Sequence, residues 1–190
     1  MLRSASTFAA AVCLVACSAP DDQRADFLGS LQPLCGNSYT GQVVSTQEVD
    51  AAWRAEALRL GPVACGANEV RLPLAVGADT SRTWIVRMSG SGLSLRHQHL
   101  HADGEQDAVS MYGGFAAEGG TATRQDFPAD EWTRTLFVDN DLPNSVANTW
   151  TLEIVPGETL TYRLSRPESV DGRDFRAEFD LAQPLSNPSP

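Results

Sequence analysis

All three histidines of this 190-residue chain, His97, His99 and His101, lie in one short segment that acidic residues follow. Imidazole binds zinc, copper, nickel or iron at neutral pH, and carboxylates complete many such sites. Alternate residues of a strand lie about 6.7 Å apart, so two of these rings reach one ion, whereas residues 97 and 101 are about 13 Å apart unless the strand bends. One hypothesis is therefore a site for a divalent transition metal, made by two histidines with Asp103 or Asp107.

Two other interpretations of the histidine segment stay open. Buried histidines are often satisfied by neighbouring Tyr, Asp or Glu and then stabilise a core without binding anything, and imidazole also serves as a general acid or base. Because side chains two apart on a strand share a side, the histidine face continues the face of Leu93 and Leu95. If these leucines enter the core of a barrel, the histidines point inward near one end, while Arg96 and Gln98 face water.

The rest of the chain carries no recognisable catalytic motif. It contains no Gly-x-Ser-x-Gly, no His-Glu-x-x-His and no dinucleotide-binding glycine pattern. All 14 basic residues are arginine, and the absence of lysine excludes Schiff-base enzymes, P-loops, protein kinases and Ser-x-x-Lys acylases. We therefore assign no catalytic residue, favour a binding protein over an enzyme, and expect no cofactor other than the metal considered above.

The N-terminus has the organisation of an export signal. Arg3 precedes an uncharged apolar segment, residues 8–16, which is too short to span a bilayer. Its end, Leu14-Val15-Ala16-Cys17, resembles the lipobox of bacterial lipoproteins. That resemblance implies that residues 1–16 are a signal peptide, that Cys17 carries diacylglycerol and becomes the acylated N-terminus, and that residues 17–26 are a polar tether. Ser18 after the cysteine favours outer-membrane sorting in a Gram-negative cell.

The charge of the chain limits its partners. Twenty-four acidic and 14 basic residues give a net charge of −10, and loss of Arg3 with the signal leaves 13 − 24 = −11. So acidic a protein is not attracted to nucleic acid or to anionic lipid. We therefore expect membrane attachment through the N-terminal lipid, in the cell envelope, facing the periplasm if the cell has an outer membrane.

The four cysteines divide into two kinds. Cys13 leaves with the signal and Cys17 takes the lipid, which leaves Cys35 and Cys65. In an exported protein an even number of remaining cysteines favours a disulfide. Two metal-binding thiolates are the alternative, but no histidine flanks either cysteine.

Two-residue alternation of apolar and polar side chains dominates residues 27–182 and predicts a single all-β domain followed by an irregular tail, residues 183–190. Tight turns between the strands, such as Pro156-Gly157, join antiparallel neighbours. About eight or nine strands are expected, near residues 41–46, 70–76, 84–88, 93–101, 108–112, 121–127, 150–154, 160–164 and 175–181. One or two short helices are expected at residues 50–60 and 128–137, because capping residues, Pro or Gly mark their ends.

A sheet with this many strands hides its edges in a small barrel or, alternatively, in a β-sandwich, and the simple hairpins favour an up-and-down barrel. The pattern resembles lipocalins in general character, without their Gly-x-Trp start. Residues 81–128, with RTWIV, GLSLRHQHLHADG and ATRQDFPAD, resemble an uncharacterised group of bacterial exported proteins. We expect a lipid-anchored envelope protein that binds a small ligand or another envelope component. The alternatives are a metal-binding protein or metal-dependent enzyme, and a purely structural envelope partner.

Overall fold

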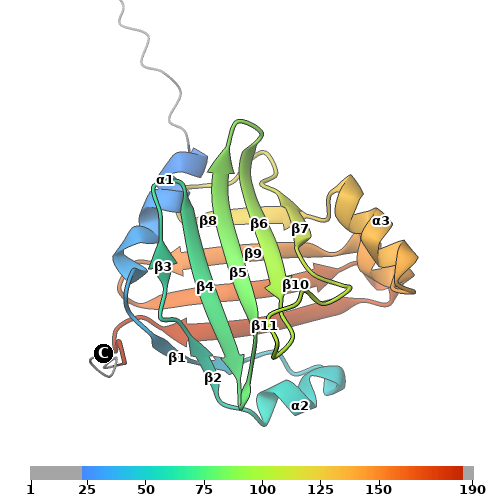
Figure 1. The fold of residues 1–190 in the computed structure, drawn as a ribbon, viewed down its shortest axis with the longest axis horizontal. Coiled ribbons are helices and arrows are strands. Elements are labelled where there is room, and N and C mark those ends of the chain that lie inside the picture. Colours follow the sequence, from blue (N-terminus) through green and yellow to red (C-terminus); the bar gives the residue numbers. More distant parts are fainter. Residues whose placement is uncertain (1–22, 186–190) are drawn as a thin grey trace, which may run out of the picture.

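Strands that pair with antiparallel neighbours build almost the whole molecule (Figure 1). The computed structural model describes residues 23–185. Its eleven described strands are β1 (Tyr39–Val43), β2 (Leu58–Leu60), β3 (Ala64–Cys65), β4 (Glu69–Val76), β5 (Asp79–Ser89), β6 (Gly92–His99), β7 (Tyr112–Phe115), β8 (Arg124–Pro128), β9 (Thr149–Val155), β10 (Thr159–Arg166) and β11 (Arg173–Asp180). The prediction of an antiparallel all-β barrel is confirmed.

The order of the strands is that of an up-and-down barrel. It runs β7-β6-β5-β4-β2-β1-β11-β10-β9-β8, so the first strand pairs with the last and each other neighbour follows in the chain, with β3 as a short extra strand on β4. The strand count exceeds the predicted eight or nine because β3 was not expected and β2 was only the alternative to the end of a predicted helix, residues 58–60 fitting a strand as well. β2 falls inside the predicted helix of residues 50–60, where Leu58 and Leu60 instead point into the core.

The barrel closes between β7 and β8, the two ends of the strand order. The N–H of Ala117 donates to the backbone oxygen of Asp126 at 2.8 Å, and the N–H of Asp130 donates to that of Gly113 at 3.1 Å. A Cβ on Gly114 would lie 1.8 Å from the backbone oxygen of Pro128. The two backbones therefore approach closely because residue 114 has no side chain.

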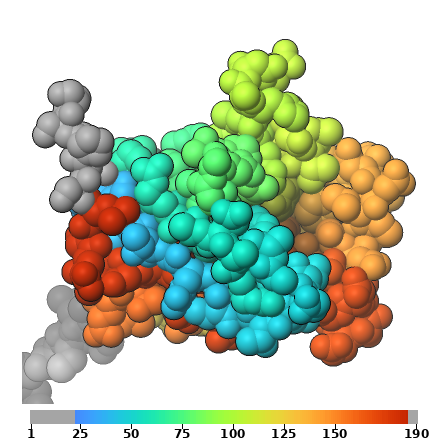
Figure 2. All heavy atoms as spheres, turned by 90° about the horizontal axis from the view of Figure 1, so that it is seen from below, coloured from blue at the N-terminus to red at the C-terminus, as the bar shows by residue number. Residues whose placement is uncertain are grey.

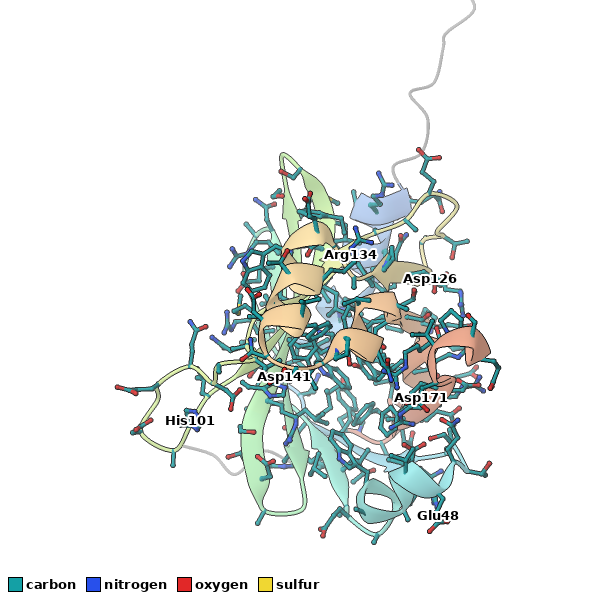
Figure 3. The ribbon with its side chains drawn as sticks, turned by 90° about the vertical axis from the view of Figure 1, so that its right-hand side faces the viewer. Glu48, His101, Asp126, Arg134, Asp141 and Asp171 are labelled. Carbon is teal, nitrogen blue, oxygen red and sulfur yellow. A yellow bond between two sulfur atoms is a disulfide. The ribbon has the colours of Figure 1, made fainter. Side chains whose placement is uncertain are left out.

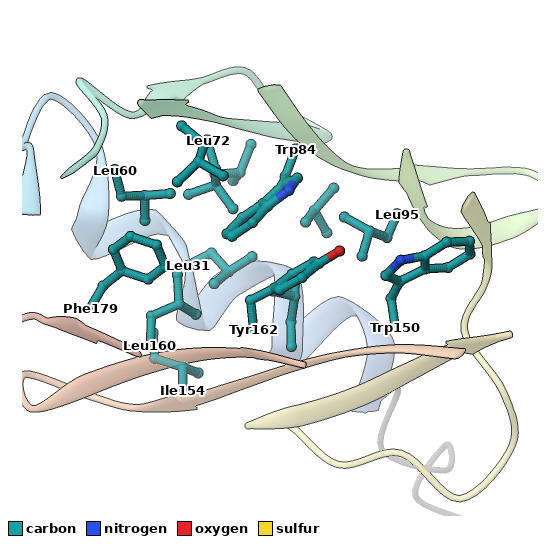
Figure 4. Close-up of a cluster of buried hydrophobic side chains, with 14 of the residues drawn as sticks. Leu31, Leu60, Leu72, Trp84, Leu95, Trp150, Ile154, Leu160, Tyr162 and Phe179 are labelled. Carbon is teal, nitrogen blue, oxygen red and sulfur yellow. The ribbon is translucent and has the colours of Figure 1, made fainter. Parts of the chain in front are cut away.

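The core lies between two walls of this flattened barrel. β4, β5 and β6 cross β8–β11 at a steep angle (Figure 1), and side chains from both walls meet in the middle (Figure 4). The largest buried side chains include Trp150, Phe27, Phe127 and Phe179. Burying the inward side of each strand is the main force that stabilises the closed sheet.

Three described α-helices flank the barrel: α1 (Gln23–Ser30), α2 (Ala51–Arg54) and α3 (Glu131–Asp139). α1 was not predicted, and it begins inside the segment expected to be a tether. α2 confirms only the first part of the predicted helix of residues 50–60. α3 begins later than predicted because Pro128 ends β8 and Asp130 caps the helix, its Oδ1 accepting the N–H of Thr133 at 2.9 Å.

One further prediction is confirmed by the described residues. Cys35 and Cys65 form the expected disulfide, with their Cα atoms 5.8 Å apart. Leu185, in the predicted irregular tail, makes one isolated bridge to Ser38. Within residues 23–185, no helix is both long and apolar enough to cross a membrane.

Candidate ligand-binding cavity

A cavity of about 280 Å³ opens at the end of the barrel beside α2. Its lining is Val49, Trp53, Arg82, Trp84, His97, His99, Tyr112, Tyr162, Leu164, Arg173 and Phe175. Figure 3 shows this end with the segments of Glu48, His101 and Asp171 around it. In the view from below, the loop of residues 100–111 stands out from the body of the protein (Figure 2). Residues far apart in the sequence therefore converge on one opening.

His97 forms the inner wall of the cavity and is 2% exposed. Its Nδ1 lies 3.2 Å from the backbone oxygen of Tyr112, and its Nε2 lies 2.9 Å from the hydroxyl of Tyr162. Because a carbonyl oxygen only accepts hydrogen bonds, Nδ1 carries the hydrogen and Nε2 accepts from the Tyr162 hydroxyl. Both ring nitrogens are therefore used by the protein itself.

Burial keeps this pair neutral. Removal from water lowers the pKa of His97 to about 3, against a partial upward effect of its hydrogen bond to the Tyr112 backbone. Burial likewise raises the pKa of the Tyr162 phenol well above its usual range. At neutral pH the two side chains form an uncharged hydrogen-bonded pair.

His99 continues the same face nearer the opening. Its backbone N–H donates to the hydroxyl of Ser110 at 2.9 Å, and its Nε2 lies 3.4 Å from the hydroxyl of Tyr112. Desolvation and the charge of Arg82 lower the pKa of His99, while Asp107 and Asp79 oppose them. Burial raises the pKa of Tyr112 to about 12. His99 is thus the histidine that meets both the cavity and the solvent side of the barrel.

Aromatic rings form much of the cavity wall. Trp84 and Tyr162 stack with centroids 4.1 Å apart and planes 6° from parallel, and His97 stacks on Tyr112 at 4.6 Å. Phe175 meets Tyr162 edge to face at 6.2 Å. Such mutual packing fixes the orientation of the rings, so that they present a rigid apolar surface to a ligand.

Two arginines also line the cavity, each held by a carboxylate and an aromatic ring. Arg82 forms an ion pair with Asp79 and lies 5.2 Å from the ring centroid of Trp53. Arg173 lies 2.5 Å from Oδ1 of the buried Asp50. Its guanidinium lies 5.8 Å from the ring centroid of Phe175. No lining residue among those described is acidic.

The prediction that the histidines point inward is confirmed for His97 and His99, which belong to β6, and is wrong for His101, which follows the strand. Leu93, Leu95 and His97 are buried, and His97 and His99 line the cavity. β6 ends at His99, so His101 instead lies in the exposed loop, its Nε2 3.7 Å from Oδ2 of Asp107.

Their polar neighbours on β6 were expected to face water, but they are only half-exposed. Arg96 bonds to Asp130 at 2.5 Å and Gln98 accepts from Arg71 at 2.7 Å. These partners on the outer side of the barrel take the place of water, so both side chains are fixed rather than free.

The proposed metal ligands are not gathered at one point. Asp103 accepts the N–H of Glu105 in the loop, away from the buried ring of His97. Across residues 23–185, no group of three or more His, Cys, Asp or Glu side chains is placed to hold a metal ion. Cys17, the predicted lipidation site, lies outside the described residues.

Sequence reasoning missed most of the cavity. Trp53, Arg82 and Arg173 come from α2, β5 and β11, and nothing in their local sequence distinguishes them from surface residues. Arg82 stands opposite His99 in the register of β5 and β6. That pairing was the one signal that would have connected an arginine to the histidine face.

Comparison with known proteins identifies no relative. No family model matches the chain, and searches of curated proteins and of solved structures find no match. Function is therefore inferred from the residues of the cavity.

Proposed function

We propose that this protein is a lipid-anchored cell-envelope protein that binds a small, planar, largely apolar molecule in the open end of its barrel. The observation that carries the proposal is the cavity itself, whose wall includes the rings of Trp53, Trp84, Tyr112, Tyr162 and Phe175. Apolar pockets with a few polar groups are the usual form of small-molecule sites. A binding role matches the absence of a recognisable catalytic motif in the sequence.

The size of the cavity limits the ligand. Small-molecule pockets usually measure about 300–1,000 Å³, and this cavity of about 280 Å³ stands at the lower end of that range. An apolar cavity of about 150 Å³ is enough for benzene. The cavity is therefore large enough for a compound with a single ring or with two fused rings.

The lining favours binding over catalysis. His97 and Tyr162 satisfy each other, so neither offers a free base or a nucleophile. Among the described lining residues there is no serine, cysteine or carboxylate. The groups that remain are aromatic faces, which give affinity for flat molecules, and polar edges at the opening, which select among them.

The envelope location rests on the N-terminal sequence. The resemblance of Leu14-Val15-Ala16-Cys17 to a lipobox supports cleavage before Cys17 and acylation of that residue. Mass spectrometry of the protein purified from membranes tests this: we expect an N-terminal peptide that begins at Cys17 and carries acyl chains. A Cys17→Ser variant should lose them and leave the membrane fraction. An unmodified Cys17 in the native protein would refute the anchor.

Binding is tested by calorimetry with naphthalene-2-carboxamide, an uncharged two-ring probe. We expect one site per chain, and a loss of at least tenfold in affinity in Leu164→Trp, which fills the cavity. Val138→Trp is the matched control, because Val138 is 59% exposed on α3 and should leave affinity unchanged. Equal affinities in both variants would place any binding elsewhere, and no binding to the wild-type protein would count against the proposal.

A further inference from the structure

The charge of the cavity is opposite to that of the protein. The whole chain carries a net charge of −10, yet the described lining of the cavity holds two arginines and no carboxylate. A positive group in the cavity of an acidic protein selects for anionic ligands. The cavity attracts an anion, whereas the negatively charged outer surface repels it. The two arginines differ in how many of their hydrogen-bond donors are already used.

Both terminal nitrogens of Arg173 already contact other side chains of the protein. Its Nη2 lies 2.5 Å from Oδ1 of Asp50, which is buried, and its Nη1 donates to Oε1 of Gln47 at 3.1 Å. The same Asp50 accepts the hydroxyl of Ser45 at 2.7 Å. Arg173 thereby holds the segment before α2 in place, and removing it would leave a buried carboxylate unpaired.

Arg82 has donors to spare. Its Nη1 bonds to Oδ2 of Asp79, and this is its only hydrogen-bond acceptor within residues 23–185. A guanidinium carries five N–H donors in a planar fork, so Nε and Nη2 stay available. The side chain is 23% exposed, at the boundary between the cavity and the solvent.

The field of Arg82 reaches His99 and Tyr112, two polar side chains of the cavity wall. After desolvation, its charge is the next cause that lowers the pKa of His99. It also opposes the upward effect of burial on the pKa of Tyr112. A ligand's anionic group placed beside His99 and Tyr112 would therefore feel the same positive charge.

We propose that the ligand of this cavity is an aromatic or similarly flat carboxylic acid, whose carboxylate binds the free edge of Arg82 while its ring lies among Trp53, Trp84 and Phe175. This inference rests on the proposed binding function and adds the chemical class of the ligand. Arginine and carboxylate match in geometry, and such charge-assisted hydrogen bonds are about twice as strong as neutral ones. Because the side chain of Arg82 is already held against the ring of Trp53, it loses little conformational freedom when it binds a carboxylate.

The test compares two probes of the same shape, naphthalene-2-carboxylate and naphthalene-2-carboxamide, by calorimetry at pH 7.5. We expect the wild-type protein to bind the acid at least tenfold more tightly than the amide. In Arg82→Gln this ratio should fall to about one. Arg163→Gln is the control: Arg163 pairs with Asp174, neither residue is among those that line the described cavity, and its loss should leave both affinities unchanged.

A second variant keeps the test informative if Arg82→Gln fails to fold. Asp79→Asn removes the carboxylate that competes for Arg82 but keeps an oxygen for the N–H of Ser81, now 2.9 Å from Oδ1 of Asp79. We expect it to raise the acid-to-amide ratio threefold or more.

An unchanged ratio in Arg82→Gln or Asp79→Asn would overturn the inference. Equal wild-type affinities for acid and amide would also overturn it, but would leave the binding function standing. If the wild-type protein binds neither probe, the proposed function fails and the carboxylate preference fails with it.

Discussion

Replacing His97 by glutamine should flatten the dependence of the protein's stability on pH between pH 7 and pH 4.5. In the folded protein burial lowers the pKa of His97 to about 3, whereas imidazole in an unfolded chain has a pKa of 6.5. Below pH 6.5 the unfolded chain therefore binds a proton that the folded protein excludes. The free energy of unfolding must fall as the pH falls through this window, and the loss ends only near pH 3.

The two pKa values set the size of the effect. A shift of one pKa unit corresponds to about 1.4 kcal/mol, so proton linkage at His97 removes about 2.5 kcal/mol of stability between pH 7 and pH 4.5. The lowered pKa of His99 acts in the same direction. Asp79, whose pKa is lowered to about 2 by hydrogen bonds from Ser81 and Arg82, loses its contribution at still lower pH. The difference between wild type and variant isolates the share of His97.

The assay is urea denaturation followed by tryptophan fluorescence at several pH values, with the dependence on urea concentration held common to both proteins. His97→Gln will be less stable at neutral pH because it loses the Tyr162 hydrogen bond, but the slope against pH is the quantity compared. His101→Gln is the control, since the side chain of His101 is 57% exposed and should leave the slope as in wild type. A His97→Gln protein with the wild-type slope would refute this account of the buried histidine.

Five other substitutions have expected effects on the free energy of unfolding by the same assay. Tyr162→Phe leaves a buried acceptor unsatisfied and should cost about 1–3 kcal/mol. Tyr112→Phe, whose hydroxyl lies 3.4 Å from its partner, should cost under about 1 kcal/mol; an equal cost would contradict the pairing described. Cys35→Ser opens a disulfide between residues 30 apart and should cost roughly 3–4 kcal/mol, as should reduction of the wild type. Gly114→Ala should cost about 2 kcal/mol or more at the barrel closure, whereas Gly90→Ala, with open space around it, should stay within about 0.5 kcal/mol; similar values for the two would argue against a tight closure.

The sequence predicts the strands well where one side is continuously apolar. Val70, Leu72 and Leu74 are all buried, as their two-residue spacing requires. Residues 58–60 were assigned to the end of a helix because Gly61-Pro62 is a stop signal, although Leu58-Arg59-Leu60 also fits a strand. In the structure these residues form a strand because they pair with β1 and β4, and those distant partners cannot be identified from the local sequence.

The candidate site was only partly predictable for a related reason. The inward direction of His97 follows from its place two residues after Leu95, and no structure is needed to see it. The neighbours that define its chemistry come from other strands: Tyr162 is 65 positions away. Whether a buried histidine meets a metal, a carboxylate or a phenol is decided by such distant pairings. The position of His101 depends on where β6 ends, and the alternation of apolar and polar residues does not by itself predict the end of a strand.

If Cys17 carries the proposed lipid, the position of α1 sets how the barrel faces the membrane. Leu28 of α1 and Met88 line the same hollow near the hairpin between β5 and β6, whereas the ligand cavity includes Arg82 at the other end of β5. Figure 1 shows α1 and α2 at opposite ends of the barrel. Cys17 lies six positions before the start of α1, a reach of at most about 20 Å. A lipid on Cys17 would therefore hold the barrel by its α1 end and turn the cavity toward the aqueous compartment, so that the ligand arrives from solution and not out of the bilayer.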